Sequence, residues 1–442
     1  MNQRLLFTGL IALLLTLGTL AAILWAKGYR PNLKERTVKG TGLLVVNSYP
    51  DGASVFLNDK LTTATNDTLH LPPGEYHVKI IKEGFIPWEK TLKLEPELVT
   101  QTNVRLFPGV PDLTALTFTG IVNVVPAPNG QRIAFAVASA SANLKNGLWV
   151  LNLNDSPLKF STNQIQIAQT TPSVDFAKAK LTWSPNSQQI LVSLPTTGTF
   201  NGLHLLLPAD SFTDSSNYRD VTDKLPLILE EWQQELALNN QKRLEKLPLF
   251  MQQVATASAQ NVFFSPDETK IVYLATKEIT IPPKLIPPLP ATSTQKEERG
   301  IKPGRIYVYD LKEDRNFLIK ESILPPQPSP APVKTLKTIP PASNPQEIET
   351  DLAKLKAQYL PLFANMPQWL STSQHLIFTD RKSPTDQSGK IEIIEYDGTN
   401  LVTVYTGQFE DDFVFPWPSG NKLVILTSLN SLATNLYAIN LR

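Results

Sequence analysis

Three consecutive acidic residues, Glu410, Asp411 and Asp412, are the first candidates for chemistry in this sequence. A pair of carboxyl groups on either side of a sugar can hydrolyse a glycosidic bond, one as the acid and the other as base or nucleophile. Acidic residues in loops are more often only solvated. We therefore predict no catalytic residue, and we treat the three acids as a candidate ligand-binding group at the mouth of a channel.

Residues that support acid–base or metal chemistry are few. The four histidines, His70, His77, His204 and His375, have no neighbours that resemble a metal-binding set. The absence of cysteine excludes disulfides, thiol catalysis and Cys-ligated zinc. No nucleotide-binding, metalloprotease, calcium-loop or serine-elbow motif occurs. A Ser–His–Asp set built from distant residues stays open, because spacing alone does not test it. We predict no cofactor and no metal.

The composition is typical of a folded protein that does not bind nucleic acid. The 442 residues include 41 Lys+Arg and 40 Asp+Glu, a net charge of +1, and 42% are hydrophobic. A nucleic-acid-binding domain normally has a basic face, whereas this apolar fraction suffices for a packed core. Proline is enriched, with 37 residues, against a usual share of about 5%. The length predicts about three units.

The N-terminal region, residues 1–26, predicts a transmembrane anchor. Residues 5–26 carry no charge, and a helix of that length spans roughly 33 Å, close to the ~30 Å hydrocarbon core of a bilayer. Trp25 ends the run, where an indole suits the membrane interface. A cleaved signal peptide is the alternative, although its apolar region is normally only ~7–15 residues long. We expect a polar linker at residues 27–40.

Short strands separated by proline and glycine turns follow, over residues 41–108. Proline presets φ and glycine accepts positive φ, so such pairs set where the chain reverses. The segment resembles the PEGA domain, with Asp51 where that family has Glu, and Lys82–Phe85 fits another of its motifs. The other matching positions are Pro50, Gly52, Ala53, Pro73, Gly74 and Tyr76.

The resemblance to the PEGA domain implies a small antiparallel β-sandwich that acts as a spacer or contacts the cell envelope. It also implies a location outside the cytoplasm. The charges favour the opposite orientation. Five basic residues lie in the linker and one, Arg4, lies before the apolar run, so the positive-inside rule places the linker and the residues after it in the cytoplasm. We expect a single-pass membrane protein with its bulk outside the cytoplasm.

A turn motif recurs through residues 109–442. Each copy separates two strands, and the copies begin at Ala127, Ser184, Ser265, Leu370 and Trp417. Four-stranded repeats are typical of propeller blades. The copies, followed by strands such as Arg305–Leu311, resemble the TolB-type, WD40-like β-propeller family. Enzymatic relatives of this fold, the propeller peptidases, carry their nucleophile on a separate hydrolase domain, which this sequence lacks.

The last repeat ends with its third strand, so the ring needs one more strand to close. Residues 113–119 lie ahead of the first copy and can supply it. This predicts five blades, with six or seven as the alternatives.

Uneven spacing between the copies predicts two insertions, at about 210–256 and 279–366. Each contains a helical stripe of apolar residues, and Pro248 should end or kink the first helix. Asn344–Glu347 reads as a capping box for the second. Both helices end in Leu-Pro-Leu-Phe, so we expect the insertions to pack against each other and to cover a blade; recruitment of a partner is the alternative. Proline-rich segments within the inserts, including 324–332, are expected to be extended connectors.

Together these features predict an all-β protein with an N-terminal transmembrane helix, a PEGA-like sandwich and a β-propeller carrying two helical insertions. We expect a non-enzymatic cell-envelope protein whose propeller face binds protein or glycan. A structural surface-layer component is the first alternative. An exported glycoside hydrolase that uses carboxylates near the propeller centre is the second.

Overall fold

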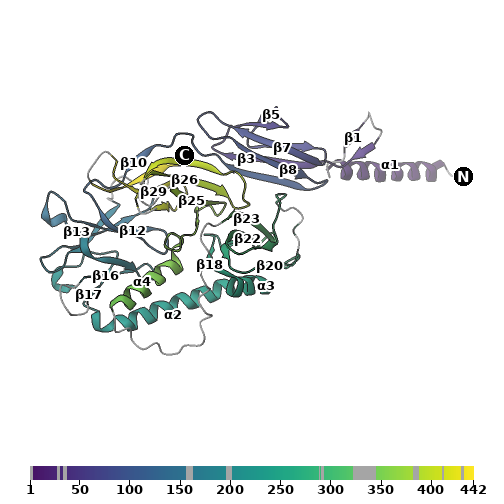
Figure 1. The fold of residues 1–442 in the computed structure, drawn as a ribbon. Helices are drawn as coiled ribbons and strands as arrows, with labels where there is room; N and C mark the ends of the chain where they lie inside the picture. The colour runs from purple at the N-terminus through teal and green to yellow at the C-terminus, as the bar shows by residue number, and fades with distance from the viewer. Residues whose placement is uncertain are drawn as a thin grey trace. The chain divides into compact units, whose positions relative to one another are not determined.

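The chain is mostly β-structure with few helices, and it divides into two compact units. The computed structural model describes residues 3–26, 30–32, 37–155, 163–195, 202–287, 289, 293–321, 345–381, 388–410, 413–429 and 433–442. The first unit contains residues 1–109 and 288–296, and the second contains residues 110–287 and 297–442. Figure 1 shows the order of their elements.

The first unit begins with helix α1 (Gln3–Ala26), at the position of the predicted anchor. Its described side chains, from Phe7 to Ile23, are all exposed, and nine of them are large and apolar. Within the part of the chain that the structure describes, no helix is both long enough and apolar enough to cross a membrane. The expected helix is therefore present, whereas the predicted transmembrane span is not supported. In the linker, β1 (Arg30–Asn32) pairs with β2 (Thr37–Lys39).

Two sheets form a small sandwich over residues 42–105. One has the strand order β6-β3-β9 and the other β5-β4-β7-β8. Alternate side chains, such as Leu44, Val46, Val55 and Ile80, point into the space between the sheets and form its core. The strands are β3 (Gly42–Tyr49), β4 (Ser54–Leu57), β5 (Lys60–Ala64), β6 (Asp67–Leu71), β7 (Gly74–Ile81), β8 (Trp88–Leu94) and β9 (Val99–Arg105).

The prediction of a wholly antiparallel sandwich is wrong in one strand pair. Strands β3 and β9 run parallel, with Leu43 opposite Val99 and Tyr49 opposite Arg105. The chain leaves the first sheet after β6, builds the hairpin β7–β8 in the other sheet, and then returns. Because no hairpin joins β9 to β3, the connection does not require the two strands to be antiparallel.

Among its described residues the second unit contains a two-stranded sheet, β20 (Ile279–Thr280) with β21 (Gly300–Ile301), and five larger antiparallel sheets, each built mainly from strands consecutive in the chain. We number them in chain order. They are sheet 1, β11 (Val122–Pro126), β12 (Arg132–Val137), β13 (Gly147–Asn152) and β14 (Gln164–Gln169); sheet 2, β15 (Lys180–Trp183), β16 (Gln189–Leu194) and β17 (Leu203–Pro208); sheet 3, β18 (Ala259–Phe264), β19 (Lys270–Ala275), β22 (Arg305–Asp310) and β23 (Arg315–Glu321); sheet 4, β24 (Gln368–Trp369), β25 (His375–Arg381), β26 (Ser388–Glu395) and β27 (Val402–Gln408); and sheet 5, β28 (Val414–Pro416), β29 (Lys422–Thr427), β30 (Asn435–Asn440) and β10 (Leu113–Ala115).

Sheet 5 joins the beginning of the second unit to the end of the chain. Strand β10 pairs antiparallel with β30, with Leu113 opposite Ile439, as expected for residues 113–119. The buried Thr117 strengthens this junction, because its hydroxyl donates to Asn435 Oδ1 and accepts from the backbone N–H of Leu436. Sheet 2 differs from the predicted four-stranded repeat, since its described part has three strands.

The recurrent turn motif has one backbone geometry in all five copies. In each copy the N–H of the fourth residue donates to the carbonyl of the first, over 2.8–3.0 Å. The fourth residue has a positive φ of 56–73° every time. Glycine adopts this conformation without steric cost, whereas the other three copies hold non-glycine residues there. The five residues are Gly130, Ser187, Glu268, Ser373 and Gly420.

Three pairs of neighbouring sheets pack face to face, and the helical insertions cover the remaining faces of sheets 2 and 3. Sheets 1 and 2 share one apolar core, sheets 5 and 1 another, and sheets 3 and 4 a third. The opposite face of sheet 2 packs on α2 (Leu225–Leu244) and α4 (Pro345–Tyr359). The opposite face of sheet 3 packs on α3 (Leu249–Gln253) and the turns next to it. The insertions therefore occupy a place that a neighbouring sheet takes elsewhere (Figure 1).

The expected packing of the two insertions is confirmed. Leu229, Trp232 and Leu236 of α2 and Leu352 and Leu355 of α4 belong to one buried cluster on the face of sheet 2. The first helix ends before Pro248, which precedes α3, as the sequence predicts. The predicted cap at Asn344 and the proline-rich segment 324–332 lie outside the described residues.

Candidate functional site

A cavity of about 580 Å³ lies between sheet 2 and helix α4, entirely within the second unit. Its size falls in the range of small-molecule sites, about 300–1,000 Å³. The wall combines several apolar side chains with three lysines, a glutamate, a serine and a histidine. It is formed by Lys178, Lys180, Thr182, Ser193, Leu194, Pro195, Gly202, His204, Ile348, Glu349, Leu352, Ala353, Lys356 and Phe363.

Strand register and helix periodicity bring these side chains together. Lys180 pairs with Ser193, and Ser193 pairs with His204, so the three share one face of sheet 2. On α4, the residues at 348, 349, 352, 353 and 356 lie on one stripe, because neighbours three and four positions apart share a helix face. The short helix η6 (Pro361–Ala364), which follows α4, adds Phe363.

Lys356 is the most perturbed cation of the cavity. Desolvation, with the positive charge of Lys180 nearby, lowers the pKa of Lys356 from 10.5 to about 8. Its ammonium lies 5.7 Å from the centre of the Phe363 ring. Among the described residues no carboxylate forms an ion pair with it. A partly buried ammonium in this setting favours an anionic ligand.

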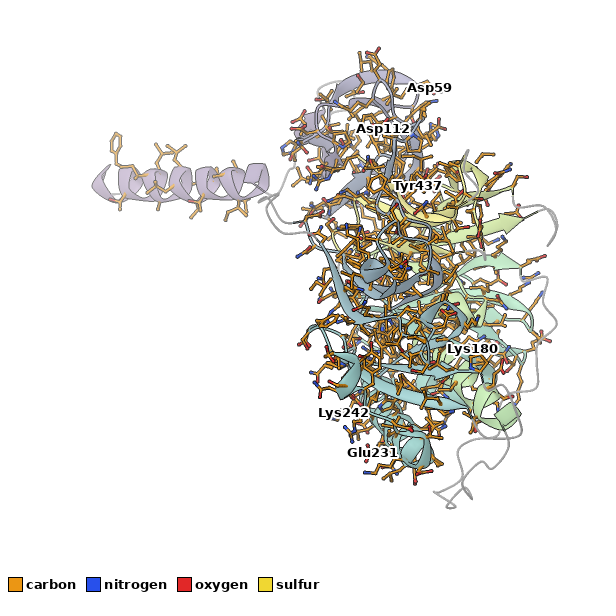
Figure 2. All side chains as sticks on the ribbon, turned by 90° about the vertical axis from the view of Figure 1, so that its left-hand side faces the viewer. Asp59, Asp112, Lys180, Glu231, Lys242 and Tyr437 are labelled. Carbon is orange, nitrogen blue, oxygen red and sulfur yellow. The ribbon has the colours of Figure 1, made fainter. Side chains whose placement is uncertain are left out.

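The other two lysines lie at the exposed rim of the cavity. Lys180 forms an ion pair with Glu349 of α4, and both side chains are more than 60% exposed. Lys178 pairs with Asp175 at 3.2 Å. Figure 2 labels Lys180 on sheet 2, and it labels Glu231 and Lys242 on α2. Three lysines against one glutamate make the lining positive at neutral pH, and exposed ion pairs rearrange at little cost.

The floor of the cavity contains a serine–histidine pair. The Ser193 hydroxyl lies 3.0 Å from His204 Nδ1. Burial lowers the pKa of His204 below 6.5, although Asp220 opposes the shift, so the ring is neutral at pH 7. Within the described chain no carboxylate hydrogen-bonds to this ring. The pair places a hydroxyl and an imidazole side by side at the cavity. In serine hydrolases a third group orients the base of such a pair.

The predicted acidic group is only partly described. Glu410 lies in the loop before β28, where its Oε1 accepts a hydrogen bond from Thr434. Asp411 and Asp412 lie outside the described residues. Glu410 is not among the residues that line the cavity beside α4. Within the described part of the chain, no three His, Cys, Asp or Glu side chains are grouped to hold a metal ion.

The predicted PEGA motif residues lie at turns of the sandwich. Pro50–Ala53 connects β3 to β4: Gly52 has a φ of +67°, and Lys82 Nζ donates to the Asp51 carbonyl at 2.8 Å. Ala53 is buried. Pro73 precedes Gly74, which begins β7, and the Tyr76 hydroxyl donates to the Pro72 carbonyl. Trp88 is buried in the sandwich core.

The cavity is not anticipated from the sequence, because the two roles expected for the second insertion are to cover a blade or to recruit a partner. The apolar stripe of α4, Ile348–Leu352–Leu355–Tyr359, is the side that faces the protein. Lys356 stands directly after Leu355 and four residues after Leu352, which places a cation beside this stripe. A lysine at the edge of a covering face is the signal from which the cavity could have been anticipated.

The outer side of the first insertion exposes three leucines among mostly polar residues. Leu227 and Leu238 of α2 are 57% and 52% exposed, and Leu249 at the start of α3 is 79% exposed. Leu227 and Leu238 are eleven residues apart, close to three helical turns, so they lie on the same side of α2. We call these three residues the outer leucines.

Comparison with known proteins identifies one module of the chain. No curated protein matches the sequence. Among solved structures, a putative TolB from Agrobacterium tumefaciens is 12% identical, with 77% of this chain and 74% of that chain covered and a TM-score of 0.21. TolB from Acinetobacter baumannii is 10% identical, with 84% of this chain and 65% of that one covered, less than two thirds of its length, and a TM-score of 0.23.

The β-propeller domain of the Trilobed protease from Pyrococcus furiosus is 10% identical, with 90% and 83% of the two chains covered and a TM-score of 0.17. The match to a family model lies within the first unit. All seven motif residues between Pro50 and Tyr76 fall within it. Residues 41–109 match the PEGA domain, as those motifs predicted.

Proposed function

We propose that this protein is a non-enzymatic component of the cell envelope whose second unit, a five-bladed propeller, binds a protein partner. The outer leucines carry this proposal. Exposed leucines on one side of a helix can take part in a protein-binding surface, where a partner removes them from water. The opposite face of α2 is buried against sheet 2, so the exposed side is the one open to a partner. The PEGA domain then acts as a spacer or as a second contact with the envelope.

Site-specific photo-crosslinking tests the partner surface. A photoreactive benzoylphenylalanine replaces Leu227 or Leu238 in the full chain, and cells are irradiated. The matched control replaces Leu144, which is 72% exposed beside sheet 1. We expect one adduct of defined mass at both α2 positions and none at Leu144. Equal adducts at all three positions, or none at α2, would contradict the proposal.

The same experiment separates two alternatives. An adduct that contains two copies of this 49.1 kDa chain supports a structural surface component that binds itself. If α2 gives no protein adduct and the purified protein binds a defined sugar on a glycan array, the ligand is a glycan instead.

The proposal includes attachment to a membrane through α1. The helix has no buried side chain between Phe7 and Ile23, although most of these residues are apolar. Such a surface is stabilised by transfer out of water, at about 25 cal/mol per Å². The full chain should float with liposomes in a density gradient, whereas replacement of Leu13, Leu14 and Leu17 by Asn should leave it at the bottom. Equal flotation of both proteins would count against attachment by α1.

A hydrolase is the second candidate, and the Ser193–His204 pair is the observation that favours it. If the pair acts on esters, Ser193→Ala should abolish turnover of a short-chain p-nitrophenyl ester. Turnover that is absent in the natural protein, or unchanged in Ser193→Ala, supports the non-enzymatic function.

A further inference from the structure

We propose that the cavity between sheet 2 and α4 binds a single-chain amphiphile with an anionic carboxylate or phosphate head, Lys356 contacting the head and the apolar wall holding the chain. This site is separate from the outer leucines and does not depend on the protein partner proposed above.

The charge of the lining is the first support. Lys178, Lys180 and Lys356 all reach the cavity, whereas Glu349 is its only acidic side chain among the lining residues given for the described chain. Lys180 already pairs with Glu349, and Lys178 with Asp175. Lys356 lies deeper, and nothing in the described part of the structure neutralises it. An ammonium that is partly removed from water gains most from an anion placed against it.

The shape of the lining is the second support. Leu194 and Leu352 are buried at the wall, and Ile348, Ala353 and Phe363 continue it along α4 and η6. A small inorganic anion would contact Lys356 but would leave this apolar surface exposed to water. A ligand with an anionic head and a hydrocarbon chain satisfies both parts of the wall, because each buried methylene contributes roughly 0.8 kcal/mol.

The floor allows the head group to be recognised in detail. Ser193 and the neutral His204 lie beside each other on sheet 2 and can each donate or accept one hydrogen bond. Both groups suit an oxygen-rich anion. Neither carries the negative charge that a cationic amphiphile would require.

Photolabelling with a diazirine-bearing decanoate tests the site in the full chain. Labelled peptides are mapped by mass spectrometry. We expect saturable labelling of peptides from residues 345–363 and 178–195. Decanoate and decyl phosphate should compete, and the better of the two identifies a carboxylate or a phosphate as the preferred head. Acetate, inorganic phosphate and decanol should compete at least about tenfold more weakly.

Three variants assign the role of Lys356. Lys356→Met keeps the length and apolar stem but removes the charge, and it should weaken labelling at least about tenfold. Lys356→Arg keeps the charge and should retain most of the labelling. Lys242→Met, at an exposed position of α2, is the matched control and should label as the natural protein does.

Several results would overturn the inference. Unchanged labelling of Lys356→Met would show that this lysine does not bind the head group. Equal competition by decanol would show that no anion is required, and equal competition by acetate or inorganic phosphate would show that no chain is required. Labels mapped outside the two peptides would place the amphiphile elsewhere.

Discussion

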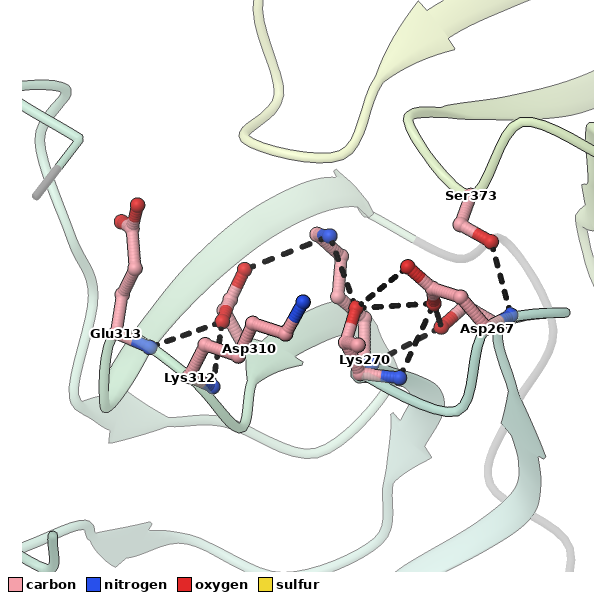
Figure 3. Close-up of polar contacts among 8 residues, drawn as sticks. Asp267, Lys270, Asp310, Lys312, Glu313 and Ser373 are labelled. Carbon is pink, nitrogen blue, oxygen red and sulfur yellow. Dashed lines mark hydrogen bonds and ion pairs between the residues drawn. The ribbon is translucent and has the colours of Figure 1, made fainter.

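The backbone N–H of Asp267 donates a hydrogen bond to the Ser373 hydroxyl, 3.1 Å away, and so links the turn motif of sheet 3 to that of sheet 4 (Figure 3). Asn129 and Ser187 make the same contact between sheets 1 and 2, also at 3.1 Å. The recurrent turn thus joins neighbouring sheets as well as neighbouring strands.

The junction before sheet 3 is different because the first insertion intervenes. The fourth residue of that turn is Glu268, and it binds cations from the end of the insertion helix. Arg243 Nε lies 3.1 Å from Glu268 Oε1, and Lys246 contacts the other carboxylate oxygen. These charges together lower the pKa of Glu268, against the opposing effect of burial. At this junction Glu268 therefore contacts the first insertion, whereas the fourth residue of the turn in sheets 2 and 4 contacts the turn of the preceding sheet.

Ser373→Ala should lower the free energy of unfolding by about 0.5–1.5 kcal/mol, because it removes the hydroxyl of the buried Ser373 that accepts a hydrogen bond from the Asp267 N–H. Ser419→Ala is the matched control: Ser419 stands one position earlier in the last copy of the motif and is exposed, so its change should stay within about 0.5 kcal/mol. Urea unfolding of the full chain measures both. Equal effects would show that the contact between turns is not stabilising.

A second prediction concerns the buried ion pair beside this turn. Lys270 Nζ lies 3.6 Å from Asp310 Oδ2, and both side chains are 5–6% exposed. The ammonium also lies 4.5 Å from the centre of the Tyr396 ring, and Asp310 accepts from the N–H groups of Lys312 and Glu313 (Figure 3). Breaking such a pair from one side leaves a buried charge, at a cost of about 3–5 kcal/mol.

Asp310→Asn should therefore be strongly destabilising, and the double variant Lys270→Met/Asp310→Asn should recover much of the loss. Lys354→Met removes an exposed pair with Asp351 and should change stability by less than about 1 kcal/mol. Chemical denaturation compares the natural protein with Asp310→Asn, Lys270→Met, the double variant and Lys354→Met. A double variant as unstable as the sum of its single changes would show that the two charges do not interact.

The contact between the two ends of the second unit gives a third prediction. Thr117→Val keeps the shape of the side chain but removes the hydroxyl that bonds to Asn435 and Leu436. Because Asn435 and the Leu436 N–H are buried and then lack this hydrogen-bond partner, we expect the free energy of unfolding to fall by about 1–3 kcal/mol. Deletion of residues 110–120 removes β10 altogether and should destabilise all five sheets, as seen in a lower melting temperature. Normal melting of the deletion variant would show that this junction is dispensable.

The fourth prediction follows from the lowered pKa of Lys356. Between about pH 8 and 10.5 the unfolded chain holds this proton more tightly than the folded chain does. Stability contributed by this residue therefore rises with pH across that window, by at most about 1.4 kcal/mol per pH unit. When unfolding is measured at pH 7, 8, 9 and 10, the free energy of unfolding of the natural protein should increase relative to that of Lys356→Met above pH 8. Parallel pH curves would contradict the shift.

Much of the fold follows from local patterns in the sequence. Each turn motif carries its own hydrogen bond and positive φ, so the five copies are recognisable without knowledge of their neighbours. The α2 helix shows its buried stripe directly, and Pro248 marks its end because proline removes a backbone donor. The seven PEGA motif residues are similarly local, since they make tight turns or begin strands. The junction between β10 and β30 was predictable because an incomplete last repeat needs one more strand.

Other features depend on contacts between distant segments, which no local pattern predicts. The parallel pairing of β3 with β9 arises after the chain has crossed to the other sheet and returned. The packing of α4 beside α2 on sheet 2 depends on contact between apolar faces from segments more than 100 residues apart in the chain. The cavity needs Lys180 and His204 from sheet 2 and Lys356 from α4, which are brought together across 176 and 152 positions by that packing. Most helices and strands are therefore predictable, because their patterns are local, whereas the candidate site depends on packing between segments far apart in the chain.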